Sequence, residues 1–172
     1  MEKETICAVV SNQDRSIRDI MKTHGTTVFH LAYARCRSWA DAEDIFQEVF
    51  LKLCAQKMRF QTDEHLKAWL IRTTVNASIN LFKSAWRRYV IHGDDTPPTD
   101  DEPTLSPRQA ALRDALQKLP QRDRVALYLR YYEDMTAEEI ARTLNEKPST
   151  VRSRIARGRR KLKDMILEEE AL

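Results

Sequence analysis

The sequence is poor in the residues that interrupt helices and in those that form covalent or metal cross-links. Of its 172 residues only three are glycine and six are proline, while 32% are charged, a composition that favours an all-α fold. The three cysteines are an odd number without a CxxC spacing, and the four histidines are scattered, so neither a disulfide framework nor a metal site is predicted. We therefore expect a helical protein that uses no metal and no other cofactor.

Long apolar runs and enzymatic motifs are also missing. No stretch of about 18 apolar residues is present, and residues 1–10 lack both the basic start and the apolar run of a secretory signal. These absences predict a cytoplasmic protein that is not inserted into a membrane. The chain has no glycine-rich phosphate loop, no nucleophile motif and no cluster of acid–base residues, so we do not expect an enzyme.

The net charge of +3 is unevenly distributed along the chain. Residues 1–90 carry a net charge of +4, residues 91–107 carry −5, and residues 108–172 carry +4. The middle segment contains four prolines and five acidic residues with little apolar content, which is typical of a flexible linker. We predict two small helical domains, 14–90 and 108–172, joined by the acidic linker 91–107.

Residues 136–166 have the pattern of a helix-turn-helix. Thr136 and Glu139 have the spacing of a capping box, which predicts that a helix begins there. Asn145 tolerates the left-handed backbone that ends many helices, and Pro148 suits the first position of the next helix.

The second helix of this motif combines an apolar face with a strongly basic one. Residues 147–163 contain eight Lys or Arg and no acidic residue. One face is formed at helical spacing by Val151, Ile155, Gly158, Leu162 and Met165. The opposite face carries Ser149, Arg152, Ser153, Ala156, Arg157 and Arg160. Arginine can make paired hydrogen bonds to guanine, and hydroxyls can reach phosphates, so this face predicts binding to duplex DNA, with a merely solvated basic face as the alternative.

Five further helices are expected from hydrophobic spacing. In the first domain, one helix covers 14–37 and is weakened at Gly25, and a second covers 41–53 and has an exposed acidic and amide surface. After a loop at 55–65, a long third helix runs from Leu66 to the basic cluster near residue 88. In the second domain they cover 111–119 and 122–132, which must pack on the helix-turn-helix because two helices alone cannot bury their apolar sides.

The long helix of the first domain has a second polar face. This face carries Arg72, Asn76, Asn80 and Lys83 and ends near Trp86, Arg87 and Arg88. Amides and cations beside an aromatic ring can hold unpaired bases and their backbone. The alternative is that the tryptophans are core residues, which we prefer for Trp69.

Three motifs, in this order and separation, resemble one family. They are DAEDIFQEVFLKL at 41–53, AWLIRTTVNASIN at 68–80 and LPQRDRVALYLRYYEDMTAEEIARTLNEKPSTVRSRIARGRRKLK at 119–163. Over residues 14–166 the chain is similar to bacterial RNA polymerase sigma factors of the sigma-70 family, in the extracytoplasmic-function (ECF) group that has only regions 2 and 4. The resemblance implies an alternative sigma factor that binds core RNA polymerase and directs promoter-specific initiation.

The resemblance also implies a role for each polar face. Binding of the clamp helices of the largest polymerase subunit is implied for Asp41, Asp44, Gln47, Glu48 and Phe50. Recognition and melting of the −10 element is implied for the loop 55–65 and for Arg72, Asn76, Asn80, Lys83, Trp86, Arg87 and Arg88. Reading of the −35 element in the major groove is implied for Ser149, Thr150, Arg152, Ser153, Arg154, Arg157, Arg160 and Lys161. Region 4 is further expected to contact the polymerase flap, and a separate anti-sigma factor is the expected regulator.

The turn of the helix-turn-helix departs from the family pattern. Asn145 stands where glycine is common, Glu146 where an apolar residue is usual, and Lys147 where a capping serine is common. The alternative function is a stand-alone repressor or activator that binds operator DNA through its C-terminal domain. That reading explains the helix-turn-helix, but it does not explain the polar face around Asn76 or the acidic linker.

Overall fold

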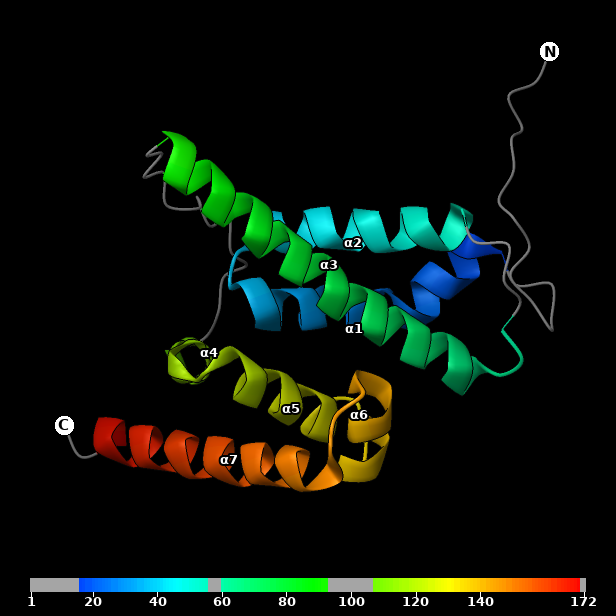
Figure 1. Ribbon diagram of the computed structural model, residues 1–172. Coiled ribbons are helices and arrows are strands. Elements are labelled where there is room, and N and C mark those ends of the chain that lie inside the picture. The colour runs from blue at the N-terminus through cyan, green and yellow to red at the C-terminus, as the bar shows by residue number, and fades with distance from the viewer. Residues whose placement is uncertain (1–15, 56–59, 93–106, 171–172) are drawn as a thin grey trace, which may run out of the picture. The chain divides into compact units, whose positions relative to one another are not determined.

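The computed structural model describes residues 16–55, 60–92 and 107–170 (Figure 1). The described residues form seven helices and no strand, which confirms the all-α prediction. The helices are α1 (Ile17–Cys36), α2 (Trp39–Ala55), α3 (Asp63–His92), α4 (Pro107–Lys118), α5 (Gln121–Tyr131), α6 (Ala137–Leu144) and α7 (Pro148–Glu170).

The chain divides into two compact units, each of which is helical. Among the described residues, the first unit holds α1 to Ala32, α2 from Ala40, and α3, and the second holds α4 to α7 with residues 33–39. The predicted linker 91–107 overlaps the last residues of α3 and the first of α4, and residues 93–106 lie outside the described residues. The predicted loop 55–65 is shorter than expected, because α3 already begins at Asp63.

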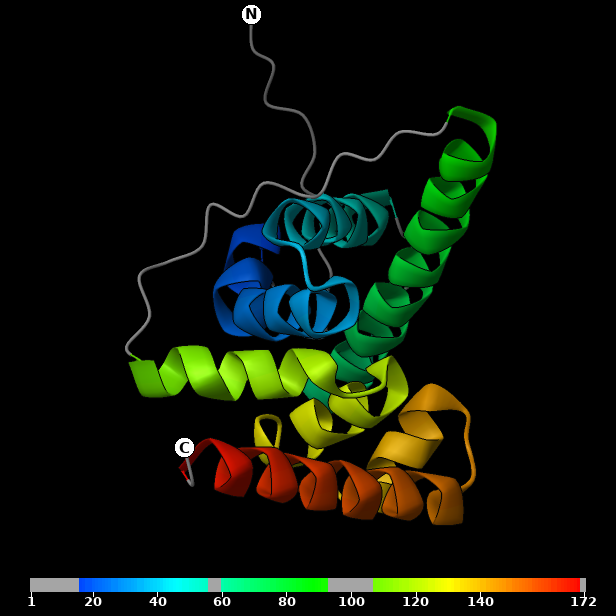
Figure 2. The same ribbon diagram turned by 90° about the vertical axis from the view of Figure 1, so that its left-hand side faces the viewer.

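In the first unit, α3 crosses the pair formed by α1 and α2 (Figures 1 and 2). The apolar face predicted for α2, Ile45, Val49 and Leu53, is fully buried. The buried apolar residues of the other two helices are Ile17, Ile20, Val28, Leu31, Ala32, Leu66, Leu70, Ile71 and Ala77. The acidic residue in the first turn of α2 and the basic residue in its last turn complement the helix dipole. The buried apolar residues of α1, α2 and α3 together form the core of this unit.

Helix α1 is not broken at Gly25, where the sequence predicts a weakened helix. Helix α1 continues through Gly25, which is buried at the point where the ring of Phe46 on α2 approaches it. A Cβ atom added there would lie 3.4 Å from that ring, an ordinary van der Waals contact, so the ring packs against this part of α1. The neighbouring His24 is buried, and its Nε2 lies 3.1 Å from Oδ1 of Asp63 at the start of α3. Packing between helices therefore outweighs the low helix propensity of glycine.

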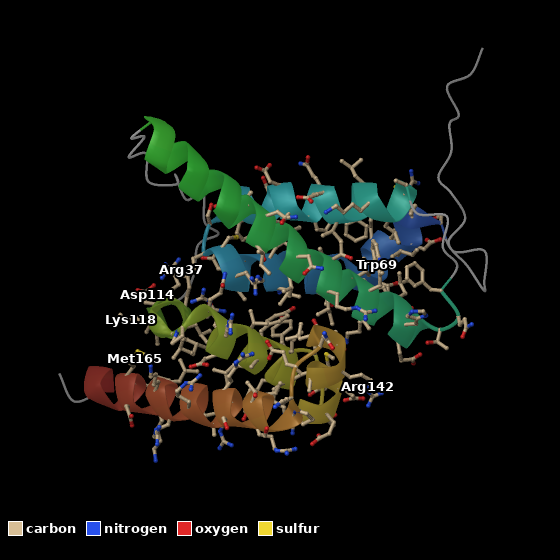
Figure 3. All side chains as sticks on the ribbon, viewed as in Figure 1. Arg37, Trp69, Asp114, Lys118, Arg142 and Met165 are labelled. Carbon is tan, nitrogen blue, oxygen red and sulfur yellow. The ribbon has the colours of Figure 1, made fainter. Side chains whose placement is uncertain are left out.

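In the second unit, α5 contacts both helices of the predicted helix-turn-helix, and α4 contacts α7. The buried apolar residues of this unit are Ala115, Leu119, Val125, Ala126, Leu127, Leu129, Ile140, Ala141 and Val151. Arg124 donates to the carbonyl oxygen of Leu119 at 2.9 Å and so satisfies one acceptor at the C-terminal end of α4. In Figure 3, the labelled Met165 lies on α7 towards α4, whereas the labelled Arg142 lies at the α6 end of the unit. The expected packing of two preceding helices on the helix-turn-helix is confirmed.

Candidate nucleic-acid interface

The first helix of the motif, α6, begins with the predicted capping box. The hydroxyl of Thr136 accepts from the backbone N–H of Glu139 at 3.2 Å, and the Glu139 carboxylate accepts from the backbone N–H of Thr136 at 2.7 Å. Two donors that a helix start leaves unsatisfied are therefore paired.

The turn that follows also has the predicted geometry. Asn145 has φ 55° and ψ 50°, the left-handed conformation, and the backbone N–H of Glu146 donates to the carbonyl of Ala141 at 2.8 Å. Helix α7 then begins at Pro148, whose missing N–H would have no partner at a helix start. The sequence 136–148 therefore fixes where α7 starts.

Helix α7 has one buried side and one exposed side. Val151 and Gly158 are buried, and Ile155, Leu162 and Met165 are half-buried, which confirms the predicted apolar face. The exposed residues on its polar side are Ser149, Thr150, Arg152, Ser153, Ala156, Arg157, Arg160 and Lys161. Helix α7 therefore exposes hydroxyl groups and positive charges to solvent along about three helical turns, from Ser149 to Lys161.

Three arginines of α7 form ion pairs with acids from three different segments. Arg152 pairs with Glu138 of α6 at 2.5 Å, Arg154 pairs with Glu146 of the turn, and Arg157 pairs with Asp123 of α5. The first pair is well exposed on both sides, and the other two each include a largely buried side chain. The pKa of Arg157 is raised above its ordinary value, chiefly by the side-chain hydrogen bonds to Asp123.

Arg154 lies differently from the expectation that it faces DNA. Its side chain is only 11% exposed, and it binds Glu146, eight residues earlier, across the turn. The Arg154 side chain therefore packs against the turn and is not part of the exposed face, while its contact with the −35 element stays a prediction. The pairing also accounts for Glu146 at a position where an apolar residue is usual, since the carboxylate has a partner.

A shallow pocket of about 500 Å³ lies where α5 begins beside α7. Thr150, Ser153 and Arg157 of α7 line it together with Asp123 of α5. Sequence spacing did not identify Asp123 as part of this face, because it is 34 residues from Arg157.

The polar face of α3 lies in the first unit. Arg72, Asn76 and Asn80 are exposed, while Thr74, Ala77 and Ser78 on the other side of the helix are buried. Trp69, labelled in Figure 3, lies near the start of α3, and its ring is 5.6 Å from the buried ring of Phe60. The side chains of Lys83, Trp86, Arg87 and Arg88 lie outside the described residues, although their backbone continues α3.

The acidic and amide surface predicted on α2 is present, but one residue of the predicted polymerase-binding set, Phe50, is buried. Asp44 and Gln47 are exposed, Asp41 and Glu48 are half-exposed, and Glu48 pairs with Lys52 at 2.5 Å. Phe50 is only 4% exposed, and its ring lies 4.7 Å from the ring of Phe46. The expectation that Phe50 belongs to a binding surface is therefore corrected, because its side chain is part of the core.

The described residues contain neither a metal-binding cluster nor a membrane-spanning helix. In that part of the chain no three His, Cys, Asp or Glu side chains gather in a way that would hold a metal ion. None of the helices described has both the length and the apolar character needed to cross a bilayer.

Two family models match the chain, one for each unit. The model described as Sigma-70 region 2 matches residues 20–88, and the model described as Sigma-70, region 4 matches residues 109–162. The first match spans nearly all of α1, α2 and α3, and the second spans α4 to α7 up to the end of the basic face.

Similar sequences carry names from the same family. The ECF RNA polymerase sigma factor SigE of Mycolicibacterium smegmatis is 31% identical over 89% of this chain and 62% of its own length. The RNA polymerase sigma-H factor of Pseudomonas aeruginosa is 32% identical, with 69% of each chain covered. The chain thus spans somewhat less than two thirds of SigE and slightly more than two thirds of sigma-H.

Similar solved structures have the same fold. The sigma factor RpoE, in complex with the anti-sigma factor NepR from Bartonella quintana, has a TM-score of 0.75 at 21% identity and covers 87% of this chain and 95% of its own. CnrH, in complex with the cytosolic domain of CnrY, has a TM-score of 0.65 at 22% identity and covers 92% of both chains.

Proposed function

The chain belongs to the sigma-70 family of RNA polymerase sigma factors, in the ECF group, and on this premise we propose that its two units each recognise one element of a promoter. A sigma factor is a transcription initiation factor and not an enzyme, and it directs RNA polymerase to promoters. The observation that carries the proposal is that each unit exposes a line of polar side chains along one helix, α3 in the first unit and α7 in the second.

In the second unit, α7 enters the major groove of the −35 element. The groove admits one α-helix, and its base edges are read by side chains that donate paired hydrogen bonds. The residues proposed to contact this element are Ser149, Thr150, Arg152, Ser153, Arg157, Arg160 and Lys161. Arg154 binds Glu146 and so holds the turn that precedes α7, on the side of the helix away from the exposed face.

In the first unit, the exposed face of α3 holds the −10 element after its strands separate. An amide can hydrogen-bond the Watson–Crick edge of a base only when that edge has left its pairing partner. Asn76 and Asn80 lie four residues apart and share one face of α3 with Arg72. The same face, continued along the sequence, leads to Lys83, Trp86, Arg87 and Arg88, for which we propose the same role.

The outer side of α2 binds the clamp helices of the largest polymerase subunit. Asp44, Gln47 and Glu48 supply an acidic and amide surface on a unit whose net charge is positive, and Asp41 adjoins it. The second unit also binds the polymerase flap. Such contacts with two parts of the polymerase hold both DNA-binding helices on one enzyme.

A separate anti-sigma protein regulates the chain. The structures of RpoE and CnrH contain the anti-sigma factor NepR and the cytosolic domain of CnrY, respectively. We place this chain in the cytoplasm, where core RNA polymerase and promoter DNA are found.

Transcription from a promoter library with purified components tests the proposal. Core RNA polymerase with the full-length protein is expected to initiate at a subset of promoters, whereas neither component does so alone. Arg152→Ala is expected to relax preference at particular −35 bases by about 5- to 150-fold, and Lys163→Ala to weaken all promoters alike. Tight binding of one duplex by the protein without polymerase would instead support the repressor or activator.

A further inference from the structure

We infer that Asp123 of α5 is a positioning residue that sets the base preference of α7 by fixing the guanidinium of Arg157. This inference rests on the proposed function, in which Arg157 contacts the −35 element. Nε of Arg157 donates to Oδ2 of Asp123 at 2.7 Å, and Nη2 donates to Oδ1 at 2.5 Å. Two parallel hydrogen bonds between planar groups fix both the position and the plane of the guanidinium.

The pairing decides which donors of Arg157 remain for DNA. A guanidinium has five N–H groups, and Asp123 uses the one on Nε and one on Nη2. The other three lie on Nη1 and Nη2, where two of them can still donate side by side. That edge matches the O6 and N7 acceptors of guanine. Asp123 therefore leaves a bidentate donor pair in one fixed orientation.

The Arg157–Asp123 pair is more deeply buried than the Arg152–Glu138 pair of the same helix. The Asp123 side chain is 0% exposed, whereas that of Arg157 is 46% exposed. If Arg157 moved away, Asp123 would become a buried carboxylate without its cation, which is strongly unfavourable. By contrast, Glu138 and Arg152 are 57% and 59% exposed, so water can solvate either when a phosphate competes. Arg157 therefore keeps its orientation when DNA approaches.

Gly158 brings the two helices close enough for this contact. A Cβ atom added at Gly158 would lie 2.8 Å from Cδ1 of Leu127 and 3.6 Å from Cβ of Asp123. Leu127 follows Asp123 by four residues, so both face α7 from the same side of α5. The residue next to Arg157 thus lets the α7 backbone lie directly against the part of α5 that carries Asp123.

The pair also changes the balance between affinity and preference. The charge of Asp123 offsets that of Arg157, so the arginine attracts phosphates less strongly than an unpaired cation at the same place. Without Asp123, the side chain is free to reach phosphates in many rotamers. Loss of Asp123 should therefore weaken discrimination between bases while general attraction to DNA is kept or increased.

Asp123→Asn tests the inference in full-length protein bound to core RNA polymerase. Promoters that differ by one base at each −35 position measure discrimination, and Asp114→Asn removes the same charge from α4 as a control. The wild type and the control should discriminate about 5- to 150-fold at the position read by Arg157. Asp123→Asn should reduce that ratio at least about threefold and steepen the salt dependence by about 0.9, the value for one more phosphate contact. Unchanged discrimination and salt dependence in Asp123→Asn would overturn the inference.

Arg157→Ala separates this inference from the proposed function. If Arg157→Ala leaves all −35 preferences intact, the proposed role of Arg157 fails, and the inference fails with it. If Arg157→Ala loses one preference and Asp123→Asn does not, only the role of Asp123 is wrong. If Asp123 acts through Arg157, the double variant should discriminate no worse than Arg157→Ala.

A measurement on the wild type covers the case in which Asp123→Asn does not fold. The Nε–H resonance of Arg157 in the 20.1 kDa chain should be protected from solvent exchange, and it should remain so when a −35 duplex is added. Loss of that protection on DNA binding would show that Arg157 leaves Asp123 and would overturn the inference.

Discussion

Glu146→Ala is expected to loosen the turn between α6 and α7, because it removes the carboxylate that Arg154 binds. The two side chains are 27% and 11% exposed, so the pair lies between a surface pair and a buried one. Surface pairs contribute about 0–1 kcal/mol, and removing one partner of a buried pair costs about 3–5 kcal/mol. For this pair we expect a loss of about 1–3 kcal/mol in the local stability of the helix-turn-helix.

Amide hydrogen exchange of α6 and α7 in the full-length protein measures this loss. One melting temperature does not describe a chain of two units, whereas exchange reports the opening of each segment. A loss of about 1–3 kcal/mol corresponds to exchange that is about 5- to 150-fold faster. Glu138→Ala is the matched control, because it removes an acid that pairs with another arginine of the same helix but is well exposed. It should change exchange by about fivefold at most.

The result that would refute this reasoning is specific. One outcome is that the amides of Glu146→Ala exchange at the wild-type rate, while Arg154→Ala loses preference at one −35 base without faster amide exchange. Arg154 would then contact DNA and would not hold the turn. If the reasoning is correct, the two single variants should share their effect. The double variant should then be less destabilised than the sum of the two.

Three further predictions concern other parts of the structure. Thr136→Ala should cost about 1 kcal/mol and speed exchange in α6, whereas Thr136→Ser, which keeps the capping hydroxyl, should change it little. Asn80→Ala and Asn76→Ala should reduce promoter opening on duplex templates, detected by permanganate reactivity of unpaired thymines, and a template already unpaired at the −10 element should partly restore it. Equal opening by variant and wild type would leave these asparagines without a role in melting. Burial, and secondarily Glu133, raises the pKa of Tyr128 above its ordinary value of about 10. The protonated Tyr128 side chain therefore contributes its full stability below about pH 10, and this contribution is lost as the pH rises above that value. Tyr128→Phe should therefore lose less stability than the wild type between neutral and strongly alkaline pH, measured by chemical unfolding.

The features predicted correctly depend on short stretches of chain. The capping box joins residues three apart, the left-handed Asn145 and the initial Pro148 reflect local backbone preference, and the buried face of α7 follows from helical spacing. Each is decided by contacts within about one or two helical turns, so the order of residues alone specifies it.

The features that the sequence did not predict depend on packing against a second helix. Gly25 lowers the helix propensity of α1, and the structure shows that the helix continues through it with the ring of Phe46 packed alongside. The family resemblance implies that Phe50 belongs to the polymerase-binding surface, but its side chain is buried in the core beside Phe46. Periodicity gives the faces of a helix, while the neighbouring elements decide how far around the helix burial extends.

By itself the sequence determined the helical class, the helix-turn-helix, the basic face of α7 and the family motifs, because periodicity, caps and charge are properties of neighbouring residues. Only the tertiary structure decided how the arginines of that face are used. It buries Arg154 against the turn and joins Arg157 to Asp123, 34 residues away, through a close approach of α5 and α7 at Gly158. An arginine in a sequence is only a positive charge on a long, flexible side chain. Its orientation depends on which carboxylate the folded chain brings within hydrogen-bond distance, and helix packing decides that.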